Sequence, residues 1–89
     1  MDLIKVLIAD DESLAIEDLT DILDWQQNGF EIVGTAKNGV QALKKIQELK
    51  PQVVITDIKM PVMDGIELAR EIRKQDCEVK IVFLSAYAE

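Results

Sequence analysis

Short runs of apolar residues alternate along the chain with stretches in which apolar residues recur every three or four positions. The runs cover residues 4–9, 31–36, 53–56 and 80–84, and they are rich in Val and Ile. Runs of this length and composition are typical of β-strands that are buried on both faces. The pattern therefore predicts four strands.

The stretches between the runs have the spacing of amphipathic helices. The first carries acidic residues opposite its apolar positions. The second begins at Asn38-Gly39 and is stopped by Pro51, and the third begins with Asp64 and Glu67, which form a capping box. The apolar faces are predicted at residues 14, 15, 19, 22 and 23 in the first helix, at 42, 43, 46 and 49 in the second, and at 66, 69 and 72 in the third.

The resulting order of elements is β-α-β-α-β-α-β. Alternating strands and helices of this kind form a parallel sheet that is covered by helices on both faces. Right-handed crossovers leave few possible topologies. The sequence thus predicts an α/β domain.

Acidic residues follow two of the strands. Asp10 and Asp11 come directly after the first, and Asp57 comes after the third. Ligands of an open parallel sheet bind outside the carboxyl ends of its strands. If these two strands are neighbours, three carboxylates converge on one crevice, with Ser85 on its rim at the end of the fourth strand.

Three carboxylates at close range repel one another, by about 4 kcal/mol for two unit charges roughly 4 Å apart at an effective dielectric near 20. Either one of them takes up a proton or a cation binds, and oxygen ligands in an open, hydrated site suit Mg²⁺. A divalent cation would offset the charge while one carboxylate attacks phosphorus, and aspartate is an accepted nucleophile for that reaction.

A purely structural interpretation stands beside this one. An Asp at the end of a strand is often a turn former or a helix cap. Asp11 could cap the first helix, and Asp10 could simply be solvated. Asp57, which precedes Lys59 and Pro61, could be a polar loop residue.

Composition removes several classes of function. The chain has 89 residues, 48% hydrophobic and 30% charged, which fits one small folded domain, and its net charge of −7 argues against direct binding to nucleic acid. It has no His and one Cys, Cys77, which excludes His-dependent catalysis, histidine zinc sites, an internal disulfide and a cysteine metal cluster. No apolar run is long enough to span a bilayer, and the N-terminus does not resemble a secretory signal. A single unpaired cysteine favours a reducing, cytoplasmic location.

Four motifs resemble the receiver domain of two-component response regulators, in the family's order along the whole chain. They are residues 6–12 (VLIADDE), Asn38-Gly39 with Ala42-Leu43, residues 57–65 (DIKMPVMDG) and residues 81–86 (IVFLSA). The resemblance implies a flavodoxin-like (CheY-like), doubly wound parallel sheet with strand order 2-1-3-4-5. On this expectation, residues 1–89 form a receiver (response regulatory) domain with strand order 2-1-3-4, and the fifth strand and last two helices are missing.

The resemblance also implies a role for each polar residue. Asp57 is the expected phosphoacceptor, which receives a phosphoryl group from the phosphohistidine of a sensor histidine kinase. Asp10 and Asp11 correspond to the acidic pair that binds Mg²⁺, with Asp11 the direct ligand, and the backbone carbonyl of Lys59 is a further ligand. Ser85 corresponds to the hydroxyl that hydrogen-bonds the phosphoryl oxygen and couples it to the neighbouring loop.

Lys59 and Tyr87 lie two residues beyond Asp57 and Ser85. In this family those positions tune the rate at which water removes the phosphoryl group. We predict that Tyr87 crowds the in-line water and that Lys59 pairs with the phosphoryl group, which together prolong the phosphorylated state. The alternative is that both are ordinary surface side chains.

Family features absent from the chain lead to further expectations. No residue corresponds to the lysine that ends the family's fifth strand, and Lys80 is in the wrong place for it. The fourth strand would be an exposed apolar edge, which favours unwanted pairing. Either the chain is a shortened form of the domain, or that edge is covered by a second copy through swapping or dimerisation.

A softer resemblance concerns the subgroup. Residues 24–25, 29–34 and 84–87 resemble receivers fused to AraC-type helix-turn-helix output domains. The implied function is phosphorelay control of transcription, with DNA contacted only through an output domain not present in the chain. Trp25 also has a plain structural interpretation as a helix-end residue that packs on Phe30, and Met60 and Met63 as loop residues that pack.

Two other functions remain open. One is a phosphorylation-independent scaffold that acts through dimer contacts. The other is an aspartate-nucleophile phosphohydrolase, but those enzymes carry a second acid two residues after the nucleophile, where this chain has Lys59. A signalling domain without enzymatic turnover, at most modifying itself, is therefore expected.

Overall fold

The computed structural model describes residues 2–75 and 78–84, and within them all seven predicted elements are present. Cys77, Ser85 and Tyr87 lie outside the described residues. The element bounds agree with the sequence prediction to within one or two residues. They are β1 (Ile4–Ala9), α1 (Ser13–Ile22), β2 (Phe30–Ala36), α2 (Gly39–Leu49), β3 (Val53–Asp57), α3 (Gly65–Gln75) and β4 (Lys80–Leu84).

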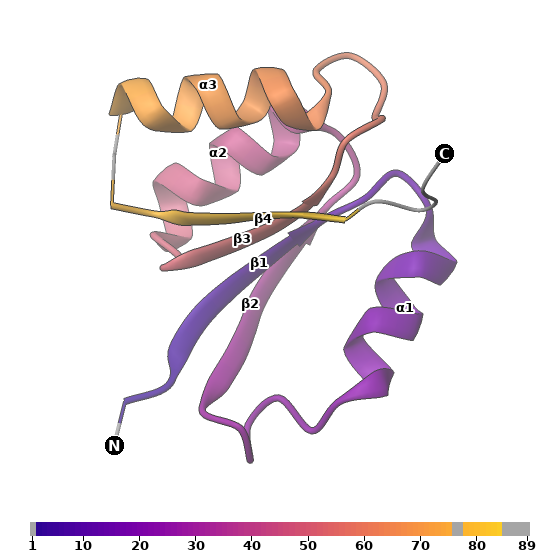
Figure 1. The fold of residues 1–89 in the computed structure, drawn as a ribbon, viewed down its shortest axis with the longest axis vertical. Helices are drawn as coiled ribbons and strands as arrows, with labels where there is room; N and C mark the ends of the chain where they lie inside the picture. The colour runs from indigo at the N-terminus through magenta and orange to yellow at the C-terminus, as the bar shows by residue number, and fades with distance from the viewer. Residues whose placement is uncertain (1, 76–77, 85–89) are drawn as a thin grey trace.

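The four strands form one parallel sheet in the order β2-β1-β3-β4. Helix α1 covers one face of the sheet, and α2 and α3 lie together over the other (Figure 1). This arrangement confirms the doubly wound, flavodoxin-like α/β fold and the strand order 2-1-3-4. It also makes β1 and β3 direct neighbours, the condition on which the predicted cluster of acids depended.

The core lies on both sides of the central strand β1, whose residues 6–9 are at most 1% exposed. Leu7 belongs to the larger cluster, which packs under α2 and α3, whereas Val6 and Ile8 belong to the smaller one with Ile16 of α1. Burial of each such side chain contributes about 1.5–3 kcal/mol. The outer strands are less covered, so the expectation that every strand is buried on both faces holds only for the centre of the sheet.

The predicted buried faces of two helices need correction. In α1 the buried residue is Ile16, whereas Leu14 and Ile22 are each 72% exposed. A single helix over the sheet buries only a narrow stripe, so apolar residues beside that stripe remain in solvent. In α3 the buried residues are Gly65, Leu68 and Ile72, so the predicted burial of Ile72 is confirmed, whereas Ile66 is 39% exposed. The predicted face of α2 is confirmed.

The predicted helix starts of α2 and α3 are confirmed by side-chain caps. The Asn38 carboxamide oxygen accepts a hydrogen bond from the backbone N–H of Gln41 at 2.8 Å. At α3, Asp64 accepts from the N–H of Glu67 at 2.8 Å, and the Glu67 carboxylate accepts from the N–H of Asp64 at 3.4 Å. Each cap satisfies backbone donors that have no partner within their helix.

Trp25 has the packing role expected of it. Its ring meets that of Phe30 edge-on, with centroids 6.2 Å apart. Its indole N–H also donates to the carbonyl oxygens of Leu19 and Thr20, at 3.1 and 3.2 Å. Trp25 thus joins the end of α1 to the start of β2.

Strand β4 is the outermost strand of the sheet in the described part of the chain. Two of its apolar side chains are well exposed, Val82 at 47% and Phe83 at 40%. The predicted exposed apolar edge is confirmed. Among residues 2–75 and 78–84, none of the helices combines the length and the apolar character that a membrane crossing needs.

Candidate functional site

Three carboxylates meet at the carboxyl end of the two central strands. Asp10 and Asp11 follow β1 and Asp57 ends β3, and one oxygen from each lies within 4.8 Å of the others. The parallel pairing of β1 with β3 produces this cluster, because Ala9 is opposite Thr56 and the next residue of each chain segment is an acid, Asp10 and Asp57. The predicted convergence of the three acids is confirmed.

The environments of the three acids differ. Asp10 is 5% exposed, and its carboxylate accepts a hydrogen bond from the N–H of Glu12 at 3.0 Å. Asp57 is half-buried and accepts from the N–H of Ile58 at 2.8 Å. Asp11 is exposed. The N-cap of α1 is Glu12, which makes no side-chain cap hydrogen bond, so Asp11 is not the cap. Because Asp10 is buried, it is not a solvated surface residue.

Electrostatics at the cluster favour a bound cation. Burial raises the pKa of Asp10 above its ordinary value of 3.8, and the nearby charges of Asp57, Asp11 and Glu12 raise this pKa further. The hydrogen bond from the Glu12 N–H opposes part of that increase. A cation would stabilise the charged forms of all three acids. The donor set consists of carboxylate oxygens, which are the ligands that Mg²⁺ and Ca²⁺ prefer.

The loop between β3 and α3 is held against this site by two glycines. Gly65 donates to the carbonyl of Ile58 at 2.8 Å, and a Cβ on Gly65 would lie 2.2 Å from the carbonyl oxygen of Asp57. Gly39 donates to the carbonyl of Met63 at 3.0 Å, and a Cβ there would lie 2.4 Å from that oxygen. Both contacts require glycine, because real Cβ atoms do not approach a carbonyl so closely.

Sequence reasoning did not predict these glycine contacts, which shape the loop beside Asp57. Gly39 and Gly65 were visible as parts of motifs, but nothing in their local pattern shows which carbonyl each would face. The predicted packing role of the loop methionines is confirmed, because Met60 is 9% exposed and Met63 packs against the core. The loop therefore has a fixed shape next to Asp57.

Comparison with known proteins identifies the chain's family. The family model described as the response regulator receiver domain matches residues 6–89. The chain belongs to the response regulator receiver family. The matched region includes all three acids at the carboxyl end of β1 and β3.

Similar proteins include several transcriptional regulators. The chain is 39% identical over 85 residues to the transcriptional regulatory protein YesN of Bacillus subtilis, covering 96% of the chain and 23% of that protein. It is 45% identical over 83 residues to HptR of Staphylococcus aureus, covering 93% of the chain and 32% of that protein. The receiver domain therefore spans about a quarter to a third of the length of these relatives.

Solved structures give the same result. The receiver domain of AraT, a response regulator from Geobacillus stearothermophilus, matches with a TM-score of 0.87 and 32% identity, over 91% of this chain and 63% of that one. A two-component transcriptional regulator AraC from Clostridium phytofermentans matches with a TM-score of 0.87 and 34% identity, over 96% of this chain and 66% of that one. Both matches support the flavodoxin-like α/β fold described above.

The remaining predicted site residues of the receiver are only partly described. Lys59 lies exposed in the loop between β3 and α3. Ser85 and Tyr87 fall outside the described residues. The roles assigned to their side chains, and to the Lys59 carbonyl as a ligand, stay predictions.

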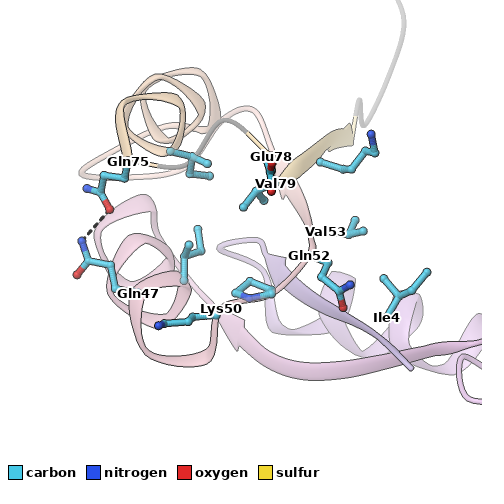
Figure 2. A pocket seen from close by; sticks show the side chains of 12 residues that line it. Ile4, Gln47, Lys50, Gln52, Val53, Gln75, Glu78 and Val79 are labelled. Atoms are coloured by element: carbon cyan, nitrogen blue, oxygen red, sulfur yellow. Dashed lines mark hydrogen bonds between the residues drawn. The ribbon is translucent and has the colours of Figure 1, made fainter. Parts of the chain in front are cut away.

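A cavity of about 770 Å³ lies at the opposite end of the sheet. It is lined by residues at the starts of β1, β3 and β4, among them Ile4, Val53 and Lys80, and by the ends of α2 and α3. Figure 2 shows Gln47 and Gln75 joined by a hydrogen bond at its margin, at 2.9 Å. The cavity is separated from the acidic cluster by the length of the strands, so it is not part of the candidate site.

Proposed function

We propose that this receiver domain is a Mg²⁺-dependent phosphoacceptor in which Asp57 receives a phosphoryl group from the phosphohistidine of a sensor histidine kinase. The observation that carries the proposal is the convergence of Asp10, Asp11 and Asp57, with oxygens within 4.8 Å of one another, in a chain of the receiver family. Asp57 is the acceptor because it is the one acid on β3, beside the loop that the two glycines hold in place.

The proposed step is a simple transfer. A carboxylate oxygen of Asp57 attacks phosphorus, a P–O bond forms, and the P–N bond to the donor histidine breaks. The imidazole leaves with the electron pair and takes up a proton, and the product is an acyl phosphate. A Mg²⁺ ion held by the three acids and the Lys59 carbonyl would supply charge neutralisation. Asp10, which burial and its hydrogen bond to the Glu12 N–H hold in place, would orient that ligand set.

The proposal extends to the residues that read and remove the phosphoryl group. Ser85 would hydrogen-bond a phosphoryl oxygen and transmit its presence to the adjoining loop. Lys59 and Tyr87 would slow hydrolysis, the first by pairing with the phosphoryl group and the second by crowding the attacking water. The domain would therefore carry a long-lived signal and would not turn over a substrate as an enzyme does.

The partners follow from the same proposal. The relatives are transcriptional regulators that are three to four times longer than the matched region. We infer that phosphorylation controls a separate DNA-binding output domain, of AraC type as in one of the similar structures. A dimer of receivers, formed on activation or through the exposed β4 edge, would transmit the signal.

The proposal is tested by incubating the protein with Mg²⁺ and acetyl phosphate and measuring the mass of the intact chain. We expect one added phosphoryl group, which is lost when a chelator removes Mg²⁺ and in the variant Asp57→Asn. The matched control is Asp21→Asn, the same chemical change at an exposed position of α1, which should leave the adduct unchanged. Turnover of a phosphomonoester would instead show a phosphohydrolase, and a chain that takes up no phosphoryl group would be a scaffold.

A further inference from the structure

The positive charges of the chain are unevenly distributed. All ten Lys and Arg residues lie in the described part, and eight of them lie on helices or strands or, for Lys50, at the end of a helix. Lys59, in the loop beside Asp57, and Lys37, directly after β2, lie at the carboxyl end of the sheet. The eight others are Lys5, Lys44, Lys45, Lys50, Arg70, Arg73, Lys74 and Lys80.

The backbone fixes the position of Lys37. Strand β2 pairs with β1 so that Ala36 is opposite Ala9, and the N–H of Asp10 donates to the carbonyl of Ala36 at 2.9 Å. Lys37 therefore leaves the sheet beside Asp10. Its own N–H donates to the side chain of Gln41 at 3.0 Å, which ties the residue to the first turn of α2.

The side chain of Lys37 is directed across the β1–α1 turn. Its ammonium donates a hydrogen bond to the hydroxyl of Ser13, 24 residues away in the chain and the first residue of α1. That partner is neutral, so the contact fixes the ammonium without neutralising its charge. Ser13 follows Asp11 by two residues, so their Cα atoms are at most about 7.6 Å apart, and the ammonium is held at the same turn as the Asp11 carboxylate.

We propose that Lys37 is a specificity-determining residue that draws anionic phosphodonors to the acidic site. This inference rests on the proposed phosphoacceptor function and adds a preference among donors. A chain with a net charge of −7 repels a dianion such as acetyl phosphate, and a fixed cation at the rim of the site reduces that repulsion locally. In the step itself, a carboxylate oxygen of Asp57 forms the bond to phosphorus, the bond from phosphorus to the acetyl oxygen breaks, and acetate leaves with the electron pair.

The expected effect follows from Coulomb's law. For an assumed separation of about 9 Å, a unit positive charge changes the local concentration of a dianion in water roughly 3-fold at an ionic strength near 0.01 M, and by much less at about 0.5 M. Replacement of Lys37 should therefore lower the rate constant at subsaturating acetyl phosphate roughly 3-fold at low salt. The maximum rate at saturating donor should stay unchanged, because Lys37 does not contact the reacting atoms.

The experiment measures phosphorylation of the full chain by acetyl phosphate and by phosphoramidate, which has a smaller net negative charge, across a salt series. At low salt, Lys37→Met should lower the rate constant for phosphorylation by acetyl phosphate, and by a smaller factor that for phosphoramidate. At high salt, the variant and the wild type should have almost the same rate constant with either donor. Lys37→Arg should restore the rate, and Lys37→Glu should lower it about 10-fold, since the change in charge is doubled. Ser13→Ala, which keeps the charge and removes its hydrogen-bond partner, should change the rate less than 2-fold.

The matched control is Lys5→Met, which makes the same change in net charge at the other end of β1. Five residues of strand separate Lys5 from Asp10, about 16 Å, so at an ionic strength near 0.01 M, where the screening length is about 30 Å, Lys5→Met should lower the rate less than 2-fold. Equal effects of Lys37→Met and Lys5→Met, or a loss at Lys37 that does not depend on salt, would overturn the inference while leaving phosphorylation of the wild-type chain intact. If the wild-type chain takes up no phosphoryl group from either donor, the proposed function fails and this inference fails with it.

Discussion

Gly65 offers a direct test of how tightly the β3–α3 loop is packed on the site. The change Gly65→Ala adds a Cβ that would lie 2.2 Å from the carbonyl oxygen of Asp57 and 3.0 Å from the Cα of Ile58. Both atoms are backbone, so the clash is relieved only if the chain moves by about 1 Å, and overpacking of this kind costs about 1–3 kcal/mol, occasionally more. Alanine gains up to about 1 kcal/mol of helix propensity at the start of α3. We therefore expect a net loss of about 2 kcal/mol in the free energy of unfolding.

The loss is large for a domain of this size, whose total stability is about 4–13 kcal/mol at 0.05–0.15 kcal/mol per residue. It is measured by urea unfolding, followed by Trp25 fluorescence and far-UV circular dichroism, and should lower the midpoint by about 1–2 M. The control is Gly34→Ala, whose Cβ would meet only ends of side chains, a methyl group of Leu49 at 2.9 Å and one of Leu7 at 3.3 Å, and should cost less than the backbone clash at Gly65. If Gly65→Ala were no less stable than Gly34→Ala, the close approach of the loop to Asp57 would be wrong.

Three further predictions concern the site and its surroundings. Asp10→Asn removes a buried carboxylate whose pKa is raised, so the variant should be more stable than the wild type at neutral pH, and the difference should disappear as the pH falls through the raised pKa toward 3.8. Millimolar Mg²⁺ should raise the thermal midpoint of the wild type but not that of Asp11→Asn. At a Mg²⁺ concentration 100 times the dissociation constant, the expected gain in the free energy of unfolding of the wild type is about 2.7 kcal/mol. Replacement of both Lys59 and Tyr87 by Ser should speed the loss of the phosphoryl group, as followed by intact mass.

Each of these predictions has a contrary outcome. A stability difference at Asp10 that grows as the pH falls would show that burial and like charges do not raise its pKa. Equal stabilisation of Asp11→Asn and wild type by Mg²⁺ would place the cation elsewhere. Slower loss of the phosphoryl group from the double Ser variant would exclude the proposed protection by Lys59 and Tyr87.

The sequence predicted the fold well because its strongest signals are local. The apolar runs, the Asn38 cap and the capping box of Asp64 and Glu67 each act within a few residues, and the structure confirms them. The errors occurred where packing between elements decides the outcome. Which apolar side chains of α1 and α3 meet the sheet depends on how each helix lies on it, and the spacing of Leu14 or Ile66 does not contain that information.

The site shows the same division. The placement of Asp10, Asp11 and Asp57 followed from the rule that ligands bind at the carboxyl ends of parallel strands, once β1 and β3 were neighbours. Gly65 packs so close to the Asp57 carbonyl that an added Cβ would lie 2.2 Å from its oxygen. The hydrogen bond between Lys37 and Ser13 joins residues 24 apart. Contacts of this kind have no sequence pattern of their own, so they became visible only in the folded chain.

The central claim is that Asp57, served by a cation on the three acids, accepts the phosphoryl group. The most direct measurement is to phosphorylate the protein with acetyl phosphate and Mg²⁺, reduce the product with borohydride and locate the modified residue by peptide mass spectrometry. Reduction of an aspartyl phosphate yields homoserine, and the account predicts homoserine at position 57, dependent on Mg²⁺. Modification at another residue, or at position 57 without any need for Mg²⁺, would contradict it.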